Sequence, residues 1–152
     1  MDFSEVLDKE CIKLELDSSE KDEVINELAN LLYQNHKINN LETFIDDVYK
    51  REDIGVTGMG NGIAIPHGVS EQVNVPCVAI GKTKDWVKWE SIDDMPVKLI
   101  FLMAVPNSDN NKQHLKILSR ISSFLAYEPN IKMIMNSKNN EEVMNYLKDY
   151  LK

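Results

Sequence analysis

The sequence predicts an α/β fold: a single domain in which a mixed or mostly parallel β-sheet carries helices on both faces. Segments with strand character alternate along the chain with segments whose apolar residues recur at helical spacing. Residues 97–105 are apolar apart from one lysine, which is typical of a strand that is buried on both faces. Neither an internal repeat nor a long linker interrupts this order, so we expect residues 1–152 to form one domain.

The first third of the chain predicts one strand and two helices. Apolar and charged residues alternate over residues 11–16, the pattern of a half-buried strand. Residues 17–19 offer caps for a helix that ends near residue 35. Residues 39–40 are both asparagine and cap a second helix, which ends at about Arg51.

The middle of the chain predicts short strands. Residues 62–65 form an apolar run that we interpret as a buried strand. Pro66 ends this strand by removing a ladder donor, which places His67 where the strand gives way to a loop. Residues 75–82 favour a further strand, and residues 85–89 favour a short strand or a turn.

The last third predicts three helices after a polar loop at residues 107–111. The first helix carries His114 and is expected to end before Pro129, because proline disfavours helix in the residue before it. A short helix follows at residues 131–135. Asn139 or Asn140 then caps a final helix.

Charge and hydropathy exclude several classes of protein. The chain has 25 acidic side chains and 17 lysines and arginines, for a net charge of -8. Long-range repulsion therefore argues against binding to nucleic acid or to an anionic membrane surface. No apolar run approaches the ~18 residues of a membrane helix, and the first residues lack the basic segment of a signal peptide. We expect a cytoplasmic protein without membrane insertion, in which Cys11 and Cys77 are reduced and buried.

Residues 51–68 hold five of the six glycines in the chain. Glycine has no side chain to pack in a core. We therefore expect a segment this rich in glycine to function through its backbone groups. We expect Gly58, Gly60 and Gly62 to set backbone turns, and turns of this kind present N–H groups to anions. His67 follows at the carboxyl end of a predicted strand, where sites in α/β sheets are usually found.

A histidine in this position acts as a nucleophile, a base or a metal ligand. The chain has no HxxxH or CxxC pair for a metal and no GxSxG elbow for a serine nucleophile. A histidine beside an anion-binding loop and Arg51 suits covalent phosphoryl transfer, in which the histidine itself accepts the phosphoryl group. This chemistry needs no metal and no cofactor. A zinc site made of His67, His114 and a carboxylate remains an alternative.

The same residues carry a resemblance to a known family. Residues 58–68 (GMGNGIAIPHG) are similar to the active-site signature of the type 2, or fructose/mannitol-type, IIA domains of the bacterial sugar phosphotransferase system (PTS), and are most like the fructose-specific IIA. Two further segments match in the family's order and spacing, residues 99–106 (LIFLMAVP) and 114–119 (HLKILS). A weaker match lies at residues 75–81 (VPCVAIG). The resemblance spans nearly the whole chain.

The resemblance implies a phosphotransferase that works through His67. In the family, this histidine accepts a phosphoryl group on Nε2 from a histidine-containing phosphocarrier protein and passes it to a IIB domain. The family also has a second histidine at the place of His114, which is then expected to donate a hydrogen bond to the phosphoryl group.

Two more residues have alternative interpretations. The family has an arginine at the place of Arg51, where a guanidinium suits phosphoryl oxygens. Without the family, Arg51 is a solvated helix end that pairs with Glu52 or Asp47. The hydroxyl of Thr57 either donates to the phosphate or satisfies a turn. Val56 stands where members commonly have serine, so one hydroxyl of the family's pattern is absent.

Two functions follow from the resemblance. The first is a phosphocarrier component for sugar uptake, of the fructose type. The second is a nitrogen-type regulatory IIA module, in which phosphorylation of His67 controls binding to a regulator by changing the charge of a docking surface.

Overall fold

The structure is a computed structural model that describes residues 3–108 and 112–151. Within these ranges, one mixed sheet has six strands in the order β1-β5-β6-β3-β2, and β4 also pairs with β6. The strands are β1 (Ile12–Leu16), β2 (Gly58–Gly60), β3 (Ile63–Ala64), β4 (His67–Ser70), β5 (Cys77–Val87) and β6 (Val97–Pro106). The helices are α1 (Lys21–Gln34), α2 (Leu41–Glu52), α3 (Gln113–Leu125), α4 (Glu128–Asn136) and α5 (Asn140–Leu151), and two short 3-10 turns (Phe3–Val6 and Lys9–Cys11) precede β1.

Strand β6 organises the sheet because it pairs with three other strands. It runs antiparallel to β5 and parallel to β3 and β4. Its side chains point alternately into two apolar layers, with Leu99, Phe101 and Met103 in one layer and Ile100 and Leu102 in the other. The predicted α/β class and the strand buried on both faces are confirmed.

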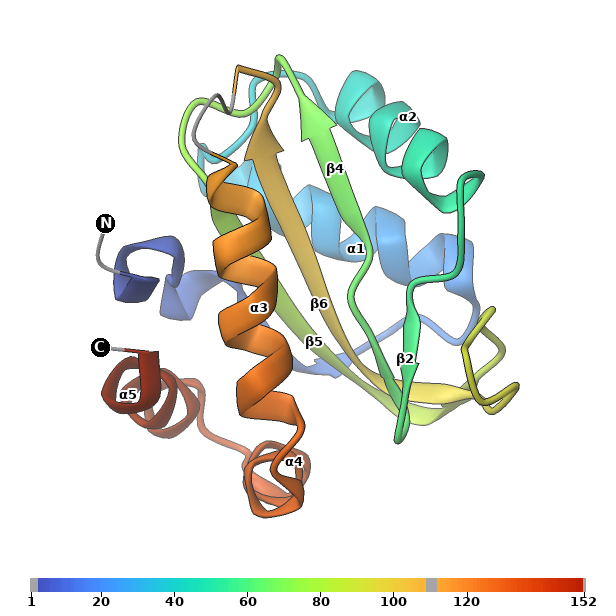
Figure 1. Cartoon of the computed structure of the whole chain (residues 1–152), viewed down its shortest axis with the longest axis vertical. Coiled ribbons are helices and arrows are strands. Elements are labelled where there is room, and N and C mark those ends of the chain that lie inside the picture. Colours follow the sequence, from blue (N-terminus) through green and yellow to red (C-terminus); the bar gives the residue numbers. More distant parts are fainter. Residues whose placement is uncertain (1–2, 109–111, 152) are drawn as a thin grey trace.

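Helices cover both faces of the sheet (Figure 1). Helices α1 and α2 pack on one face, where Leu28, Phe44 and Val48 are fully buried. Helices α3, α4 and α5 belong to the layer on the other face, which contains Phe124 and Ile134. No helix in the described ranges has both the length and the apolar character needed to cross a lipid bilayer.

Both cysteines are free thiols in the core, as expected. Cys11 and Cys77 belong to the layer beneath α1 and α2. Burial raises the pKa of Cys11 to about 11 and that of Cys77 to about 12. Both side chains are therefore neutral hydrophobes at physiological pH.

The ends of the helices agree with the prediction except at α1 and α4. Asn40 caps α2, since its side chain accepts from the N–H of Thr43 at 2.9 Å. Residues 17–19 do not cap α1; the helix begins at Lys21, and the N–H of Glu20 donates to the carboxylate of Glu23 at 3.2 Å.

Helix α4 is longer than the predicted helix at residues 131–135. It begins at Glu128, because Pro129 lies in its first turn, where a missing N–H has no intrahelical partner to lose. Asn139 caps α5, since its side chain accepts from the N–H of Glu141 at 2.9 Å. The predicted loop at residues 107–111 lies partly outside the described residues.

The glycine-rich segment folds as a hairpin rather than as a loop. Strands β2 and β3 run antiparallel, and the turn between them has φ of 58° at Asn61 and 79° at Gly62. Two successive residues with positive φ, filled by Asn-Gly, are the preferred chemistry of a two-residue hairpin turn. The prediction missed β2 because its pairing partner and its turn are both short.

His67 does not open a loop, so that part of the prediction is wrong. Strand β3 ends at Ala64, but pairing resumes at His67, which lies opposite Met103 of β6. The carbonyl of Pro66 accepts from the N–H of Met103 at 2.9 Å, so contact with β6 continues across the proline. β5 also continues to Val87, through part of the predicted strand or turn at residues 85–89.

Candidate functional site

His67 is half-buried at the start of β4, and both of its ring nitrogens have a partner. Nδ1 lies 3.2 Å from the carbonyl oxygen of Ile65; because a carbonyl only accepts, Nδ1 carries the proton. Nε2 accepts from Nε of Arg51 at 2.9 Å and therefore presents its lone pair. These two contacts select one neutral tautomer, in which Nε2 is the nucleophilic nitrogen.

The surroundings of His67 favour the uncharged ring. Burial lowers the pKa of His67 below its ordinary value of 6.5, and the positive charge of Arg51 lowers it further. The hydrogen bond to the Ile65 carbonyl and the negative charge of Glu52 act in the opposite direction. At neutral pH the ring is thus in the form that can attack an electrophile.

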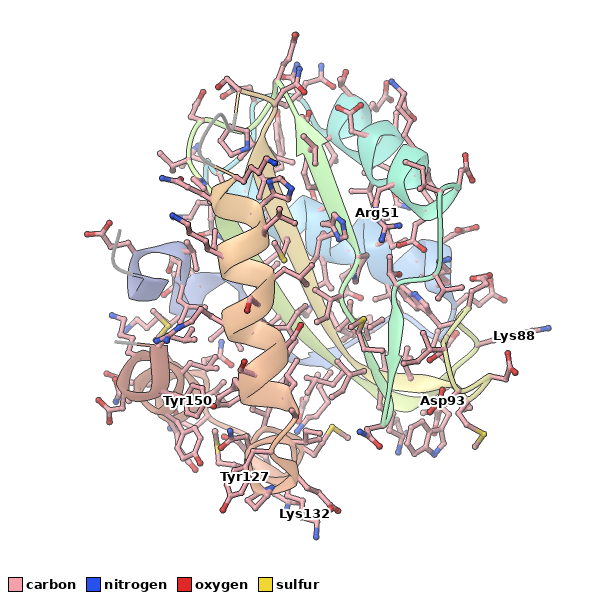
Figure 2. All side chains as sticks on the ribbon, in the orientation of Figure 1. Arg51, Lys88, Asp93, Tyr127, Lys132 and Tyr150 are labelled. Atoms are coloured by element: carbon pink, nitrogen blue, oxygen red, sulfur yellow. The ribbon has the colours of Figure 1, made fainter. Side chains whose placement is uncertain are left out.

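Arg51 lies in the last turn of α2 (Figure 2), and its side chain extends to His67. Besides its bond to His67, its Nη1 donates to the carbonyl oxygen of Gly55 at 3.0 Å. In the alternative interpretation Arg51 pairs with Glu52 or Asp47. In the structure these carboxylates pair with lysines, and Arg51 donates to His67 and Gly55. The guanidinium lies at the nucleophilic nitrogen, where its N–H groups suit the oxygens of a phosphoryl group.

His114 lies half-buried in the first turn of α3. A positive charge on His114 lowers the pKa of His67, so the two rings are within electrostatic range of each other. The first turn is also the positive end of the helix dipole. The fold therefore brings His67 of β4, Arg51 of α2 and the start of α3 to the same region.

Thr57 is 1% exposed, and its hydroxyl has partners inside the protein. The hydroxyl donates to Oε1 of Glu52 at 2.7 Å and accepts from the indole N–H of Trp89 at 3.0 Å. Its single proton is used by Glu52, so donation to a phosphate requires that this bond break. Val56 beside it is 46% exposed and carries no polar side-chain atom.

The glycine backbone does not form the expected anion site at the amides whose partners are known. The N–H of Gly58 donates to the carbonyl of Glu90 at 3.0 Å, and the N–H of Asn61 donates to the carboxylate of Asp93 at 3.3 Å. A Cβ at Gly58 would overlap with Ser91, so this glycine permits a close approach of two chain segments. Gly60 and Gly62 have φ of 90° and 79° and set turns, as expected.

The zinc alternative finds no ligand set in the part of the chain that the structure describes. No three side chains of His, Cys, Asp and Glu gather there closely enough to hold a metal ion. Charge at the site comes from Arg51, from the start of α3 and from Glu52.

Lys21, Trp89 and Glu52 lie near the site, although almost nothing in the sequence indicated that they would. Lys21 pairs with Glu52 at 2.8 Å, and Trp89 lies against Thr57. Lys21 and Trp89 come from distant parts of the chain, so only the packing of α1 against α2 and the path of the chain after β5 bring them here. The one available hint was the position of Glu52, directly after Arg51.

Comparisons with known proteins identify the family of this chain. The family model of the phosphoenolpyruvate-dependent sugar phosphotransferase system, EIIA 2, matches residues 5–150. The chain is 35% identical over 150 residues to the PTS system fructose-specific EIIABC component of Bacillus subtilis, which covers 99% of this chain and 24% of that protein. The chain thus spans about a quarter of the length of that relative.

Two solved structures share the fold. The nitrogen regulatory protein IIA-Ntr of Neisseria meningitidis superimposes with a TM-score of 0.87 at 28% identity, over 95% of this chain and 97% of that one. The IIA mannitol enzyme of Escherichia coli, in complex with phosphorylated IIB mannitol enzyme, superimposes with a TM-score of 0.78 at 21% identity, over 92% of this chain and 95% of that one. This chain belongs to the EIIA type 2 family of the phosphoenolpyruvate-dependent sugar phosphotransferase system.

Proposed function

We propose that this chain is a phosphocarrier that accepts a phosphoryl group on Nε2 of His67 and passes it on to a IIB domain. The observation that carries the proposal is the state of His67: a neutral ring with Nδ1 protonated towards Ile65 and the Nε2 lone pair directed at Arg51. A nucleophile for phosphoryl transfer needs a free electron pair and positive charge close to the attacked phosphorus.

The transfer exchanges one N–P bond for another. The Nε2 lone pair of His67 attacks the phosphorus of a phosphohistidine on the donor, and the donor's N–P bond breaks with its electron pair returning to the donor nitrogen. Nδ1 keeps its proton throughout, so no base is required. The acceptor nucleophile on IIB repeats the step in the next transfer, and His67 regains its lone pair.

Arg51 has to exchange partners during this step. Its Nε occupies the His67 lone pair in the resting state at 2.9 Å. When the N–P bond forms, the guanidinium moves from the ring nitrogen to the phosphoryl oxygens, which are better acceptors because they are charged. His114 and the start of α3 supply further positive character on the same group.

The donor in this scheme is a histidine-containing phosphocarrier protein, and the setting is the cytoplasm. The relationship to the B. subtilis fructose-specific protein supports a fructose-type sugar system. The complex of the E. coli mannitol enzymes supports a IIB domain as the acceptor. The chain itself handles the phosphoryl group and needs no sugar pocket, metal or cofactor for this step.

A second function is favoured by the likeness to the N. meningitidis nitrogen regulatory protein. In that case, phosphorylation of His67 changes the charge of a docking surface and so controls binding to a regulator. The chemistry at His67 is the same in both functions, and they differ in what the phosphorylated protein binds.

Labelling by the general PTS proteins tests the proposal. The protein is incubated with phosphoenolpyruvate, enzyme I and the histidine phosphocarrier, and the phosphorylated residue is mapped by mass spectrometry at alkaline pH. We expect label on His67, none in His67→Ala, and undiminished label in the control His36→Ala, which alters an exposed histidine in the turn after α1. A folded wild-type protein without label, or label that persists in His67→Ala, would refute the phosphocarrier function.

A second experiment separates sugar transport from regulation. The phosphorylated protein is mixed with a fructose-type IIB domain, and loss of label from His67 is followed over time. Rapid transfer to IIB supports the sugar system. Stable label on His67 in the presence of IIB, together with binding to a regulator that depends on this label, supports the regulatory function.

A further inference from the structure

Glu52 is a buried carboxylate that follows Arg51 directly in sequence. Its side chain is 5% exposed, a level at which acidic side chains are almost always paired. Oε2 pairs with Nζ of Lys21 at 2.8 Å, and Oε1 accepts from the hydroxyl of Thr57 at 2.7 Å. Each oxygen therefore has a partner that offsets the loss of water.

Lys21 and Trp89 extend these contacts into a network. Nζ of Lys21 also pairs with Glu90 at 2.8 Å and lies 5.1 Å from the centre of the Trp89 ring. Trp89 is 5% exposed and donates its indole N–H to the oxygen of Thr57 at 3.0 Å. The first residue of α1 and the segment after β5 are thus tied to the end of α2.

Thr57 connects both partners of the hydrogen bond between Arg51 and His67. Its backbone carbonyl accepts from the N–H of Ile65 at 2.9 Å, and the carbonyl of Ile65 accepts the Nδ1 proton of His67. Its side chain holds Glu52, the neighbour of Arg51. One buried residue therefore helps to place the nucleophile through its backbone and the guanidinium through its hydroxyl.

An unrestrained carboxylate beside Arg51 would compete with His67 for the guanidinium. Arg–carboxylate pairs are strong because two parallel N–H···O bonds form at once. If Arg51 turned to Glu52, it would leave Nε2 of His67 and would no longer be placed for the phosphoryl oxygens. In the structure Lys21 and Thr57 each hold one oxygen of Glu52, and Arg51 donates to His67 and Gly55.

We infer that the network of Lys21, Glu52, Thr57 and Trp89 is a positioning device that keeps the Glu52 carboxylate away from Arg51. Thr57 is then a positioning residue that acts through Glu52 and never touches the phosphoryl group. This inference rests on the proposed role of His67 as phosphoryl acceptor, and it differs from the expectation that the Thr57 hydroxyl donates to the phosphate.

The variant Thr57→Val removes the hydroxyl while keeping the shape of the side chain. We expect Glu52 to replace the lost donor with Arg51, which takes the guanidinium off His67 and raises the pKa of His67 in an NMR titration of the ring. Phosphoryl acceptance should slow about tenfold in kcat, with KM for the phosphocarrier within about twofold of wild type. Thr57→Ser restores the hydroxyl and should return both values to those of wild type.

Two further variants act on the same carboxylate. Lys21→Met removes its other donor and should also raise the pKa of His67. Glu52→Gln should shift this pKa the opposite way, because the amide neither competes for Arg51 nor carries the negative charge that now raises the pKa of His67. The matched control is Thr83→Val, which removes another buried hydroxyl. That hydroxyl donates to the carbonyl of Asp85 on β5 at 2.8 Å. Its loss should leave the pKa of His67 unchanged.

The outcomes separate this inference from the proposed function. If wild type takes up label but Thr57→Val and Lys21→Met titrate and react like wild type, the positioning role is wrong and the phosphocarrier function stands. If wild type takes no label, the phosphocarrier function fails. The direction in which each variant changes the pKa of His67 still decides whether the network controls Arg51. If Thr57→Val does not fold, Lys21→Met and Glu52→Gln must shift the pKa of His67 in opposite directions for the inference to survive.

Discussion

At the scale of single residues, His67 combines two requirements that conflict in water. A good nucleophile needs an unprotonated nitrogen, whereas a phosphoryl group needs positive charge around it. Burial and Arg51 both lower the pKa of His67, so the cation that we propose binds the phosphoryl group also favours the neutral ring beforehand. The carbonyl of Ile65 selects which nitrogen is free.

The lowered pKa of His67 predicts a pH dependence of folding stability. As pH falls below 6.5, the unfolded chain protonates this histidine while the folded protein does not, so the free energy of unfolding declines between pH 6.5 and the lower pKa of the folded state. We expect His67→Gln, which cannot protonate, to lose less stability than wild type between pH 7.5 and pH 5.0. Urea unfolding at both pH values measures this difference.

The control for this experiment is His36→Gln, since His36 is exposed in the turn after α1. It should show the same decline as wild type. An equal decline in wild type and His67→Gln would mean that folding does not alter the protonation of His67.

At the scale of elements, the close packing of α2 on β4 sets the reach of Arg51. Gly68 follows His67, and a Cβ there would lie 2.8 Å from Cε1 of Phe44 and 2.9 Å from Cγ2 of Val48, both on α2. The absence of a side chain at this position allows the helix to approach the strand that carries His67. The second glycine with buried neighbours of this kind is Gly81 on β5, where a Cβ would lie 2.6 Å from Cδ1 of Leu16.

Gly68→Ala is predicted to affect both stability and the site. An added methyl group has to displace an aromatic ring and a β-branched side chain, which costs about 1–3 kcal/mol in the free energy of unfolding. Because α2 then moves away from β4, the bond between Arg51 and His67 weakens and the pKa of His67 rises. Chemical denaturation and NMR titration of the ring measure the two effects.

Gly81→Ala separates these effects because it overpacks the same face of the sheet away from the site. The ends of Leu16 and Leu28 adjust more easily than a ring, so it should cost no more stability than Gly68→Ala and should leave the pKa of His67 unchanged. A Gly68→Ala protein that loses stability but titrates like wild type would show that the spacing of α2 does not govern Arg51.

At the scale of the whole molecule, both apolar layers contain side chains of β6. Phe44 belongs to the layer beneath α1 and α2, and Phe124 belongs to the layer beneath α3, α4 and α5. Since β6 contributes alternate side chains to both layers, loss of packing on one face also weakens the other. We propose on this basis that the chain folds as one cooperative domain.

Phe44→Ala and Phe124→Ala test this cooperativity. Each should lower the free energy of unfolding by about 3–5 kcal/mol, because each removes a fully buried ring. In both variants, unfolding followed by far-UV circular dichroism and by tryptophan fluorescence should give one coincident transition. Helix signal lost before any change at Trp86 and Trp89 would mean that the two layers unfold separately.

Much of the fold and part of the site could be predicted from the sequence. Helical periodicity and caps such as Asn40 depend on residues a few positions apart, so they can be identified from the sequence. The apolar run of β6 likewise indicates burial on both faces. His67 could be singled out because it follows a glycine-rich run and a strand that ends at proline, whereas Arg51 and His114 were singled out mainly through the family resemblance. The path after Pro66 was missed because pairing with β6 outweighs the local effect of a proline.

Local patterns along the chain were enough to predict the class of the fold, the order of the main elements and the residue that we propose carries the chemistry. The tertiary contacts were needed to establish which nitrogen of His67 is free, what Arg51 contacts and which group the hydroxyl of Thr57 bonds. The physical reason is range: propensity and periodicity act between near neighbours, whereas a buried ion pair such as Lys21 with Glu52 exists only once two helices have packed together.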